Sequence, residues 1–228
     1  MCFSFEADLA AAAVIAPVGV ATLRQVRHRD ELVVGALPLL FALHQLVEAG
    51  VWLGFDGRLS DGAADAATRI YLIYAQAVLP ALVPLGLYLL EPVRARRRAI
   101  LPFVLIGAVV GAYLLAASGF STISARQEDH LVVYTTAVGI PTAIALGYVA
   151  ATCLPALLQS ERYLREFGAL NLLGVVVAGL LATFAFASVW CVYAALASVL
   201  ILLHFRRQRG LDHRHPLGAQ RRAALQAG

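Results

Sequence analysis

Long apolar segments, separated by loops that carry arginine in alternation, constrain this chain more than any other feature of its sequence. Hydrophobic residues make up 61% of the 228 residues and charged residues only 14%, whereas about 25% of the residues of a soluble domain are charged. In lipid the backbone must satisfy its own hydrogen bonds, which favours helices of about 20 residues. The sequence therefore predicts an all-α protein that crosses a lipid bilayer several times.

Seven apolar segments are long enough to be membrane spans. The last two form one apolar stretch, residues 167–205, which as a single helix would be about 58 Å long at a rise of 1.5 Å per residue. Because this is nearly twice the hydrocarbon thickness of about 30 Å, we expect the chain to reverse near residues 183–188. The predicted spans are 6–23, 33–54, 69–90, 100–117, 130–154, 164–184 and 187–205.

The arginines orient these spans. Of the 18 basic residues, 15 follow the first, third, fifth and seventh spans, so this side is cytoplasmic by the positive-inside rule. The sequence predicts a seven-transmembrane-helix bundle over residues 1–205, with its amino terminus outside and its carboxyl terminus in a basic cytoplasmic tail, residues 206–228. We expect a multi-pass protein of the cytoplasmic (inner) membrane.

All 18 basic residues are arginine, and this bias is typical of a GC-rich bacterial genome. The absence of lysine excludes a seven-helix retinal protein, which needs a lysine in its last span to form the Schiff base with retinal. No aromatic residue interrupts the arginines of the tail, which argues against a nucleic-acid partner.

Ionisable residues are rare inside the predicted spans. His44 and Glu48 lie one helical turn apart in the second span, and His130 begins the fifth. A charged group at mid-bilayer costs about 2.5–3.5 kcal/mol on insertion scales, so such residues are candidates for function. Imidazole and carboxylate groups at this spacing can share a proton or a metal ion. An ion pair that holds two helices together is the structural alternative.

Other polar residues map to the same depth, the outer half of the bundle. We expect one cavity there, open to the outside and lined by spans one, two, three, five and seven. Its predicted lining residues are Trp52, Gln76, Tyr134, Trp190 and Cys191. The two tryptophans also fit the belt of aromatic residues that is usual at a membrane surface.

Two functions fit these residues. The first is a metal-dependent membrane enzyme, in which His44, Glu48 and His130, with Cys2 or Glu6, hold zinc, copper or iron near the outer surface, and Glu48 acts as general base on a lipid-like or small substrate. The alternative is a proton-coupled transporter or seven-helix sensor that uses His44 and Glu48. A subunit of a larger assembly, whose protein partner the sequence does not identify, is a third interpretation.

Three motifs carry a resemblance to known sequences: the start Met-Cys-Phe-Ser, the element from His44 to Glu48 followed by Trp52, and Ser-Val-Trp-Cys at residues 188–191. Together they resemble an uncharacterised bacterial family of small polytopic membrane proteins, known as a domain of unknown function. The resemblance implies membership of a family and no activity. The candidate site residues therefore rest on their chemistry alone.

Overall fold

The structure is a computed structural model that describes residues 4–120, 123–128, 131–136, 139–180 and 186–214. Within these ranges the helices form seven rods, because α3, a π-helical segment (Ile73–Val78) and α4 follow one another without a break. The elements are α1 (Phe5–Leu23), α2 (Leu32–Phe55), α3 (Asp61–Leu72), α4 (Leu79–Leu90), α5 (Arg94–Phe120), β1 (Ile123–Glu128), β2 (Leu131–Thr136), α6 (Thr142–Leu157), α7 (Arg162–Leu180) and α8 (Phe186–Arg214).

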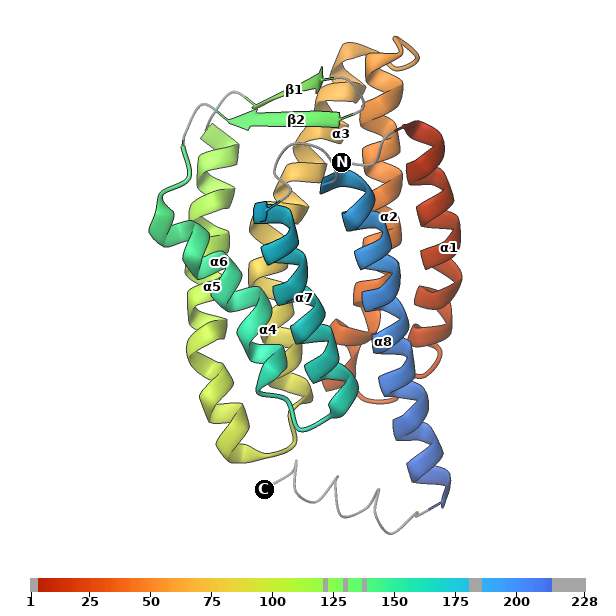
Figure 1. The fold of residues 1–228 in the computed structure, drawn as a ribbon, viewed down its shortest axis with the longest axis vertical. Helices are drawn as coiled ribbons and strands as arrows, with labels where there is room; N and C mark the ends of the chain where they lie inside the picture. Colours follow the sequence, from red (N-terminus) through yellow and green to blue (C-terminus); the bar gives the residue numbers. More distant parts are fainter. Residues whose placement is uncertain (1–3, 121–122, 129–130, 137–138, 181–185, 215–228) are drawn as a thin grey trace.

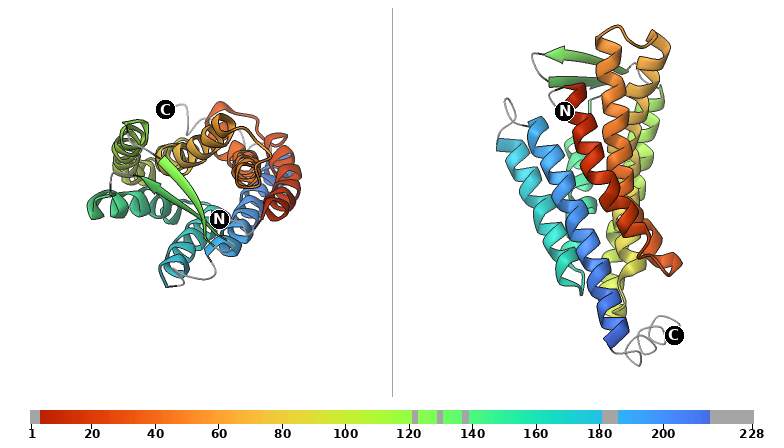
Figure 2. Two further views of the ribbon diagram at one scale, coloured as in Figure 1. Left: turned by 90° about the horizontal axis from the view of Figure 1, so that it is seen from above. Right: turned by 90° about the vertical axis from the view of Figure 1, so that its right-hand side faces the viewer.

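The seven rods form a closed ring in which successive rods run in opposite directions (Figures 1 and 2). Each rod packs against the next one along the chain, and α8 closes the ring by packing against both α7 and α1. The β1–β2 hairpin lies across one end of the ring (Figure 2). We call this the hairpin end, and the other, where Arg24, Arg98 and Arg162 are exposed, the arginine end.

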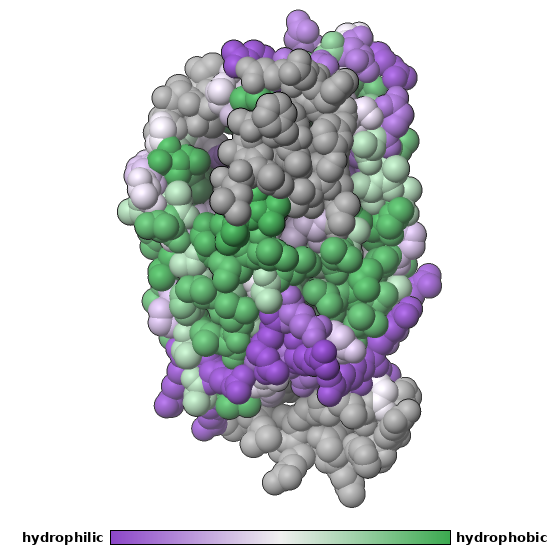
Figure 3. Space-filling model, viewed as in Figure 1, coloured by the Kyte–Doolittle hydropathy of each residue, from purple (hydrophilic) through white to green (hydrophobic). Residues whose placement is uncertain are grey.

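Four helices of the described chain are long and apolar enough to cross a membrane: Phe5–Leu23, Arg29–Phe55, Asp61–Leu90 and Arg94–Gly119. On the face shown in Figure 3, hydrophobic residues occupy the middle of the molecule and hydrophilic residues gather towards both ends. Apolar side chains such as Val14, Leu105 and Leu146 are more than 60% exposed, as expected for side chains that face lipid rather than water. The structure is thus that of a helical membrane protein.

Several predicted segments are confirmed. The first two helices begin and end within two residues of the predicted limits. The long apolar stretch at residues 167–205 is divided between α7 and α8, which lie side by side (Figure 1). The reversal itself, at residues 181–185, lies outside the described residues.

The prediction of a helix over residues 130–154 is wrong for nearly half of its length, the part before Thr142. Leu131–Thr136 pairs with Ile123–Glu128 as an antiparallel hairpin, and the helix begins only at Thr142. Valine, tyrosine and threonine dominate this segment, and such residues favour strands. Pro141 is extended (ψ 142°) and immediately precedes α6, so it begins the helix rather than kinking it, as expected for proline at a helix start.

Helix α8 extends into residues 206–228, the segment predicted to be a basic tail. Helix α8 continues past Phe205 to Arg214, and Arg209 is buried. The Arg209 guanidinium donates hydrogen bonds to the Gln25 carbonyl oxygen (2.7 Å) and to the Glu31 carboxylate. These contacts fix the extension of α8 to the loop between α1 and α2.

A second set of polar contacts joins four helices at the arginine end. The Gln159 side chain donates a hydrogen bond to the Leu87 carbonyl oxygen at 2.8 Å. Glu91 accepts hydrogen bonds from the hydroxyl (2.5 Å) and the amide (2.8 Å) of Ser160, and Arg96 donates to the Gln159 carbonyl oxygen at 2.9 Å. These side chains satisfy backbone groups at the ends of α4 and α6, where helices leave carbonyl groups unpaired.

Helix α5 packs unusually close to the third rod. A Cβ atom at Gly107 would lie 1.9 Å from the Pro80 carbonyl oxygen, and one at Gly111 would lie 2.5 Å from that of Ala77. Glycines four residues apart form the small-xxx-small pattern that lets membrane helices approach each other. This pair holds α5 against the π-helical segment and the start of α4.

Candidate functional site

A cluster of buried polar side chains lies beneath the hairpin. Asp8 reaches it from α1, His44 and Glu48 from α2, Tyr71 and Tyr74 from the third rod, and Tyr134 from β2. Asp8 and Glu48 are fully buried and His44 is 5% exposed. We refer to Asp8, His44 and Glu48 as the acid–histidine cluster.

His44 is held by stacking. Its imidazole ring lies 4.1 Å from the Tyr71 ring and nearly parallel to it (12°), and 4.7 Å from the Tyr74 ring. On its other face Tyr71 stacks on Tyr134, with ring centres 4.7 Å apart. Neither nitrogen of His44 makes a hydrogen bond within the described part of the chain. The stack fixes the ring while leaving both nitrogens available for a proton, a metal ion or a ligand.

The two carboxyl groups interact with each other. Asp8 and Glu48 are coupled electrostatically, and Glu48 also interacts with Tyr71. The indole of Trp52 lies beside Asp8, yet neither its nitrogen nor either Asp8 oxygen has a hydrogen bond of regular geometry among the described residues. Two buried carboxyl groups that interact in a low dielectric are costly to ionise together. Such a pair is suited to exchange a proton or to bind a cation.

The hairpin brings a neutral phenol to the cluster. Burial raises the pKa of Tyr134 above its usual range, and the negative charge of Glu48 raises it further. The phenol therefore keeps its proton. Since its oxygen has no hydrogen-bond partner among the described residues, Tyr134 is a free donor above the acid–histidine cluster.

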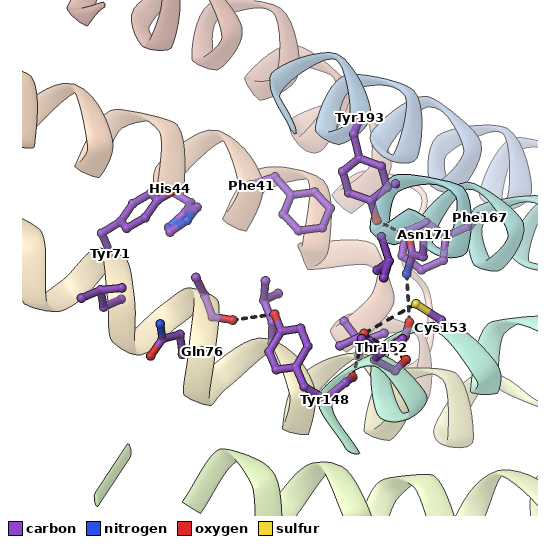
Figure 4. A pocket seen from close by; sticks show the side chains of 17 residues that line it. Phe41, His44, Tyr71, Gln76, Tyr148, Thr152, Cys153, Phe167, Asn171 and Tyr193 are labelled. Carbon is purple, nitrogen blue, oxygen red and sulfur yellow. Dashed lines mark hydrogen bonds between the residues drawn. The ribbon is translucent and has the colours of Figure 1, made fainter. Parts of the chain in front are cut away.

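A cavity of about 320 Å³ extends from His44 into the bundle. His44, Tyr71 and Gln76 lie at one end, and Thr152, Cys153, Asn171 and Tyr193 at the other (Figure 4). Phe41 and Tyr148 lie between the two ends, and the remaining wall is largely apolar. Its volume is at the lower end of the range for small-molecule sites, about 300–1,000 Å³.

The end of the cavity away from His44, which we call the inner end, is lined by a network of hydrogen-bonded side chains. Asn171 donates to the Thr152 carbonyl oxygen at 2.9 Å and accepts a hydrogen bond from the Tyr193 hydroxyl. Thr152 donates to the Tyr148 carbonyl oxygen at 2.9 Å. These contacts join α6, α7 and α8 and satisfy the polar groups of this end within the protein.

The π-helical segment forms part of the cavity wall. Ala75 and Gln76 lie in it, and the Tyr148 hydroxyl donates to the Ala75 carbonyl oxygen at 2.7 Å. A π-helical turn shifts the backbone hydrogen-bond register and is frequent at functional sites. Here its carbonyl group serves to position Tyr148.

The structure brings some of the predicted site residues together. His44, Glu48 and Tyr134 meet in or above the cluster, and Gln76 lines the cavity. Trp52 is 5% exposed and packs under the hairpin against Val132 instead of lining the cavity.

Other predicted residues do not meet the cluster in the described structure. Glu6, which was predicted to be a ligand, is exposed. Asp8, two residues later on α1, is the buried acid instead. Cys2 and His130 lie outside the described residues, as do the side chains of Trp190 and Cys191. Their roles stay predictions. The expected lining by span one is replaced by α7, which contributes Phe167 and Asn171.

Asp8, Asn171, Tyr148 and Thr152 are polar site residues that the sequence analysis missed. Asp8 had a signal, since it is an acid in the first turn of a span, but it also fits a role at a helix start. Asn171 is a strong polar residue within an apolar segment, and such residues tend to face the bundle interior. That signal was sufficient to find it.

Within the described ranges, no three His, Cys, Asp or Glu side chains are grouped closely enough to hold a metal ion. A site with three protein ligands would need a contribution from Cys2 or His130, in addition to members of the acid–histidine cluster. Carboxylate and imidazole groups suit zinc, copper and iron.

Comparison with known proteins places the chain in a family. The profile described as "Family of unknown function (DUF6629)" matches residues 1–215, so the chain belongs to this family. It has no significant match to a curated protein or to a solved structure.

Proposed function

We propose that this chain, as a member of a family of unknown function, is a cytoplasmic-membrane protein that crosses the bilayer seven times with its amino terminus outside. The alternating directions of the seven rods support this proposal, as does the gathering of exposed arginines at one end. By the positive-inside rule the arginine end faces the cytoplasm. The hairpin and the acid–histidine cluster then lie on the outer side.

Labelling of single cysteines tests this orientation. Arg58 follows α2 towards the hairpin end, Arg98 lies at the arginine end, and both are exposed. In a variant whose three native cysteines are replaced by serine, a membrane-impermeant thiol reagent should label Arg58→Cys in intact cells. It should label Arg98→Cys only after the membranes are opened. Labelling of Arg98→Cys in intact cells would contradict the orientation.

The acid–histidine cluster is, in this proposal, a proton-exchange site linked to a molecule in the adjoining cavity. The complete burial of two interacting carboxyl groups, Asp8 and Glu48, carries the proposal. Among the described residues the only buried arginine is Arg209, at the opposite end of the bundle, so it cannot neutralise them. His44 lies on the cavity wall and stacks on Tyr71, which interacts with both carboxyl groups, so the stack links the pair to the cavity. This arrangement suits a proton-linked transporter or sensor.

Infrared difference spectroscopy of the protein in bilayers tests the proton site. An acid–base titration should reveal the carbonyl stretching band of a protonated, buried carboxyl group, and Glu48→Gln should remove or shift it. The exposed carboxylate of Asp56 provides the control, since Asp56→Asn should leave the band unchanged. A band that is identical in Glu48→Gln would overturn the proposal.

A metal-dependent enzyme is the second candidate, because both nitrogens of the buried His44 are unpaired within the described chain, and Cys2 or His130 would complete the ligand set that the described residues do not form alone. A bound divalent metal would activate water or polarise a substrate, with Glu48 in the role of general base. Elemental analysis of the purified protein separates the two candidates. Near-stoichiometric zinc, copper or iron that is lost in His44→Ala would favour the enzyme.

A further inference from the structure

The two ends of the cavity differ in what they offer a ligand. At the inner end, Asn171, Thr152 and Tyr193 hydrogen-bond with one another or with the backbone. At the outer end, both nitrogens of His44 are unpaired among the described residues. The Gln76 amide also faces this end (Figure 4). A ligand would therefore place its polar group beside His44 and Gln76, because a buried donor or acceptor without a partner costs about 1–3 kcal/mol.

The apolar wall of the cavity suits a hydrocarbon chain. Phe41, Leu79, Val83 and Phe167 belong to this wall, and all four are less than 7% exposed. Burial of an alkyl chain against such a wall contributes about 0.8 kcal/mol for each methylene group. The volume of about 320 Å³ suits one chain and is small for a phospholipid with two.

Electrostatics select the charge of the ligand. The described lining contains no arginine, aspartate or glutamate, and His44 is its only titratable nitrogen base. Asp8 and Glu48 are absent from the described lining, but both interact with Tyr71, which belongs to it, so negative charge on this pair disfavours an anionic head group. A cationic amine would have to leave water without direct contact with a carboxylate, which is costly. A neutral head group that both donates and accepts hydrogen bonds meets these conditions.

We propose that the cavity binds a neutral, single-chain amphipathic molecule of the fatty-alcohol class. Its hydroxyl group hydrogen-bonds with His44 and Gln76, and its alkyl chain extends past Phe41 and Tyr148 towards Asn171 and Phe167. This inference rests on the proposed function, since it names the molecule that the proton-exchange site would sense or move. The proposed function names no ligand, and this inference supplies its chemical class.

Photoaffinity labelling in lipid nanodiscs tests the ligand class. A 1-dodecanol analogue with a diazirine in its chain should label cavity residues of α4, α6 or α7 saturably. Unlabelled 1-dodecanol should compete for this labelling, while dodecanoic acid and dodecylamine at the same concentration should compete at least tenfold less well. Equal or better competition by the acid or the amine would overturn the proposal.

Two matched variants locate the binding. Gly174 lines the cavity, and its Cβ position lies 3.5 Å from Tyr193, so Gly174→Leu should fill the site and abolish saturable labelling. Val176, two residues later and 49% exposed, provides the control: Val176→Leu should leave labelling unchanged. Gln76→Leu removes the amide with little change in shape and should weaken binding about three- to tenfold. Saturable labelling that persists in Gly174→Leu would place the alcohol elsewhere and refute the inference.

The outcome is separable from that of the proton site. If 1-dodecanol binds as expected while Glu48→Gln leaves the infrared band unchanged, the ligand class stands and the proton site fails. If the band depends on Glu48 but labelling is not saturable, the ligand class fails alone.

Discussion

Gly107→Ala is expected to destabilise the folded protein, although alanine is the better helix former. The added methyl group would lie 1.9 Å from the Pro80 carbonyl oxygen, which is backbone and cannot turn aside. Overpacking of this kind costs about 1–3 kcal/mol and occasionally more, whereas the gain in helix propensity is at most about 1 kcal/mol. We expect the melting temperature in detergent to fall by several degrees, measured as loss of the monodisperse peak in size-exclusion chromatography.

Gly119→Ala is the matched control on the same helix. Among the described residues, no atom beyond the neighbouring turns of α5 lies within 4 Å of the position that a Cβ would take at Gly119. The control should therefore gain helix propensity without a clash and melt at the same temperature as the parent or slightly above it. Equal melting of the two variants would show that α5 does not pack as described.

Asp8→Asn is expected to shift the protonation change of the acid–histidine cluster and to stabilise the protein. The substitution removes the charge that faces Glu48 but keeps the shape of the side chain. Because an unpaired buried polar group costs about 1–3 kcal/mol, and a charged one more, relief of this cost should raise the melting temperature. Glu48 would then titrate alone, so its infrared band should shift.

Glu6→Gln is the control, since it makes the same chemical change two residues earlier on α1. Glu6 is exposed, so its replacement should leave both the melting temperature and the infrared band unchanged. If Glu6→Gln altered the band and Asp8→Asn did not, the acid that the sequence analysis selected would be the functional one. A lower melting temperature for Asp8→Asn would mean that the Asp8 carboxyl group stabilises the folded protein, and would contradict the prediction.

The sequence predicted the helices well, because lipid permits few alternatives. It failed at Leu131–Thr136, where an apolar run of six residues fits a helix as well as a strand and only length distinguishes them. The sequence of β2 alone does not reveal that it pairs with β1, because the pairing also depends on the residues of β1, which come earlier in the chain. The division of residues 167–205 succeeded because bilayer thickness limits the length of a span.

The site was predicted in part for a similar reason. The pair His44 and Glu48 follows from spacing within one helix, which the sequence contains. The choice between Glu6 and Asp8 depends on how α1 is rotated, and α1 is apolar on nearly all its faces, so no stripe reveals that rotation. The inner network, with Asn171 donating to a carbonyl group of α6, depends on packing between helices.

The π-helical segment makes the position of Tyr71 depend on the exact number of residues in the third rod. One extra residue in a helix turns everything before it by about 100° relative to everything after it. Tyr71, which stacks on His44, precedes the segment, and Val83, on the cavity wall, follows it. Loss of a single residue at Ile73–Val78 would restore regular α-helix and swing Tyr71 away from His44. An insertion or deletion of one residue in a relative would thus mark the gain or loss of this site more clearly than any substitution.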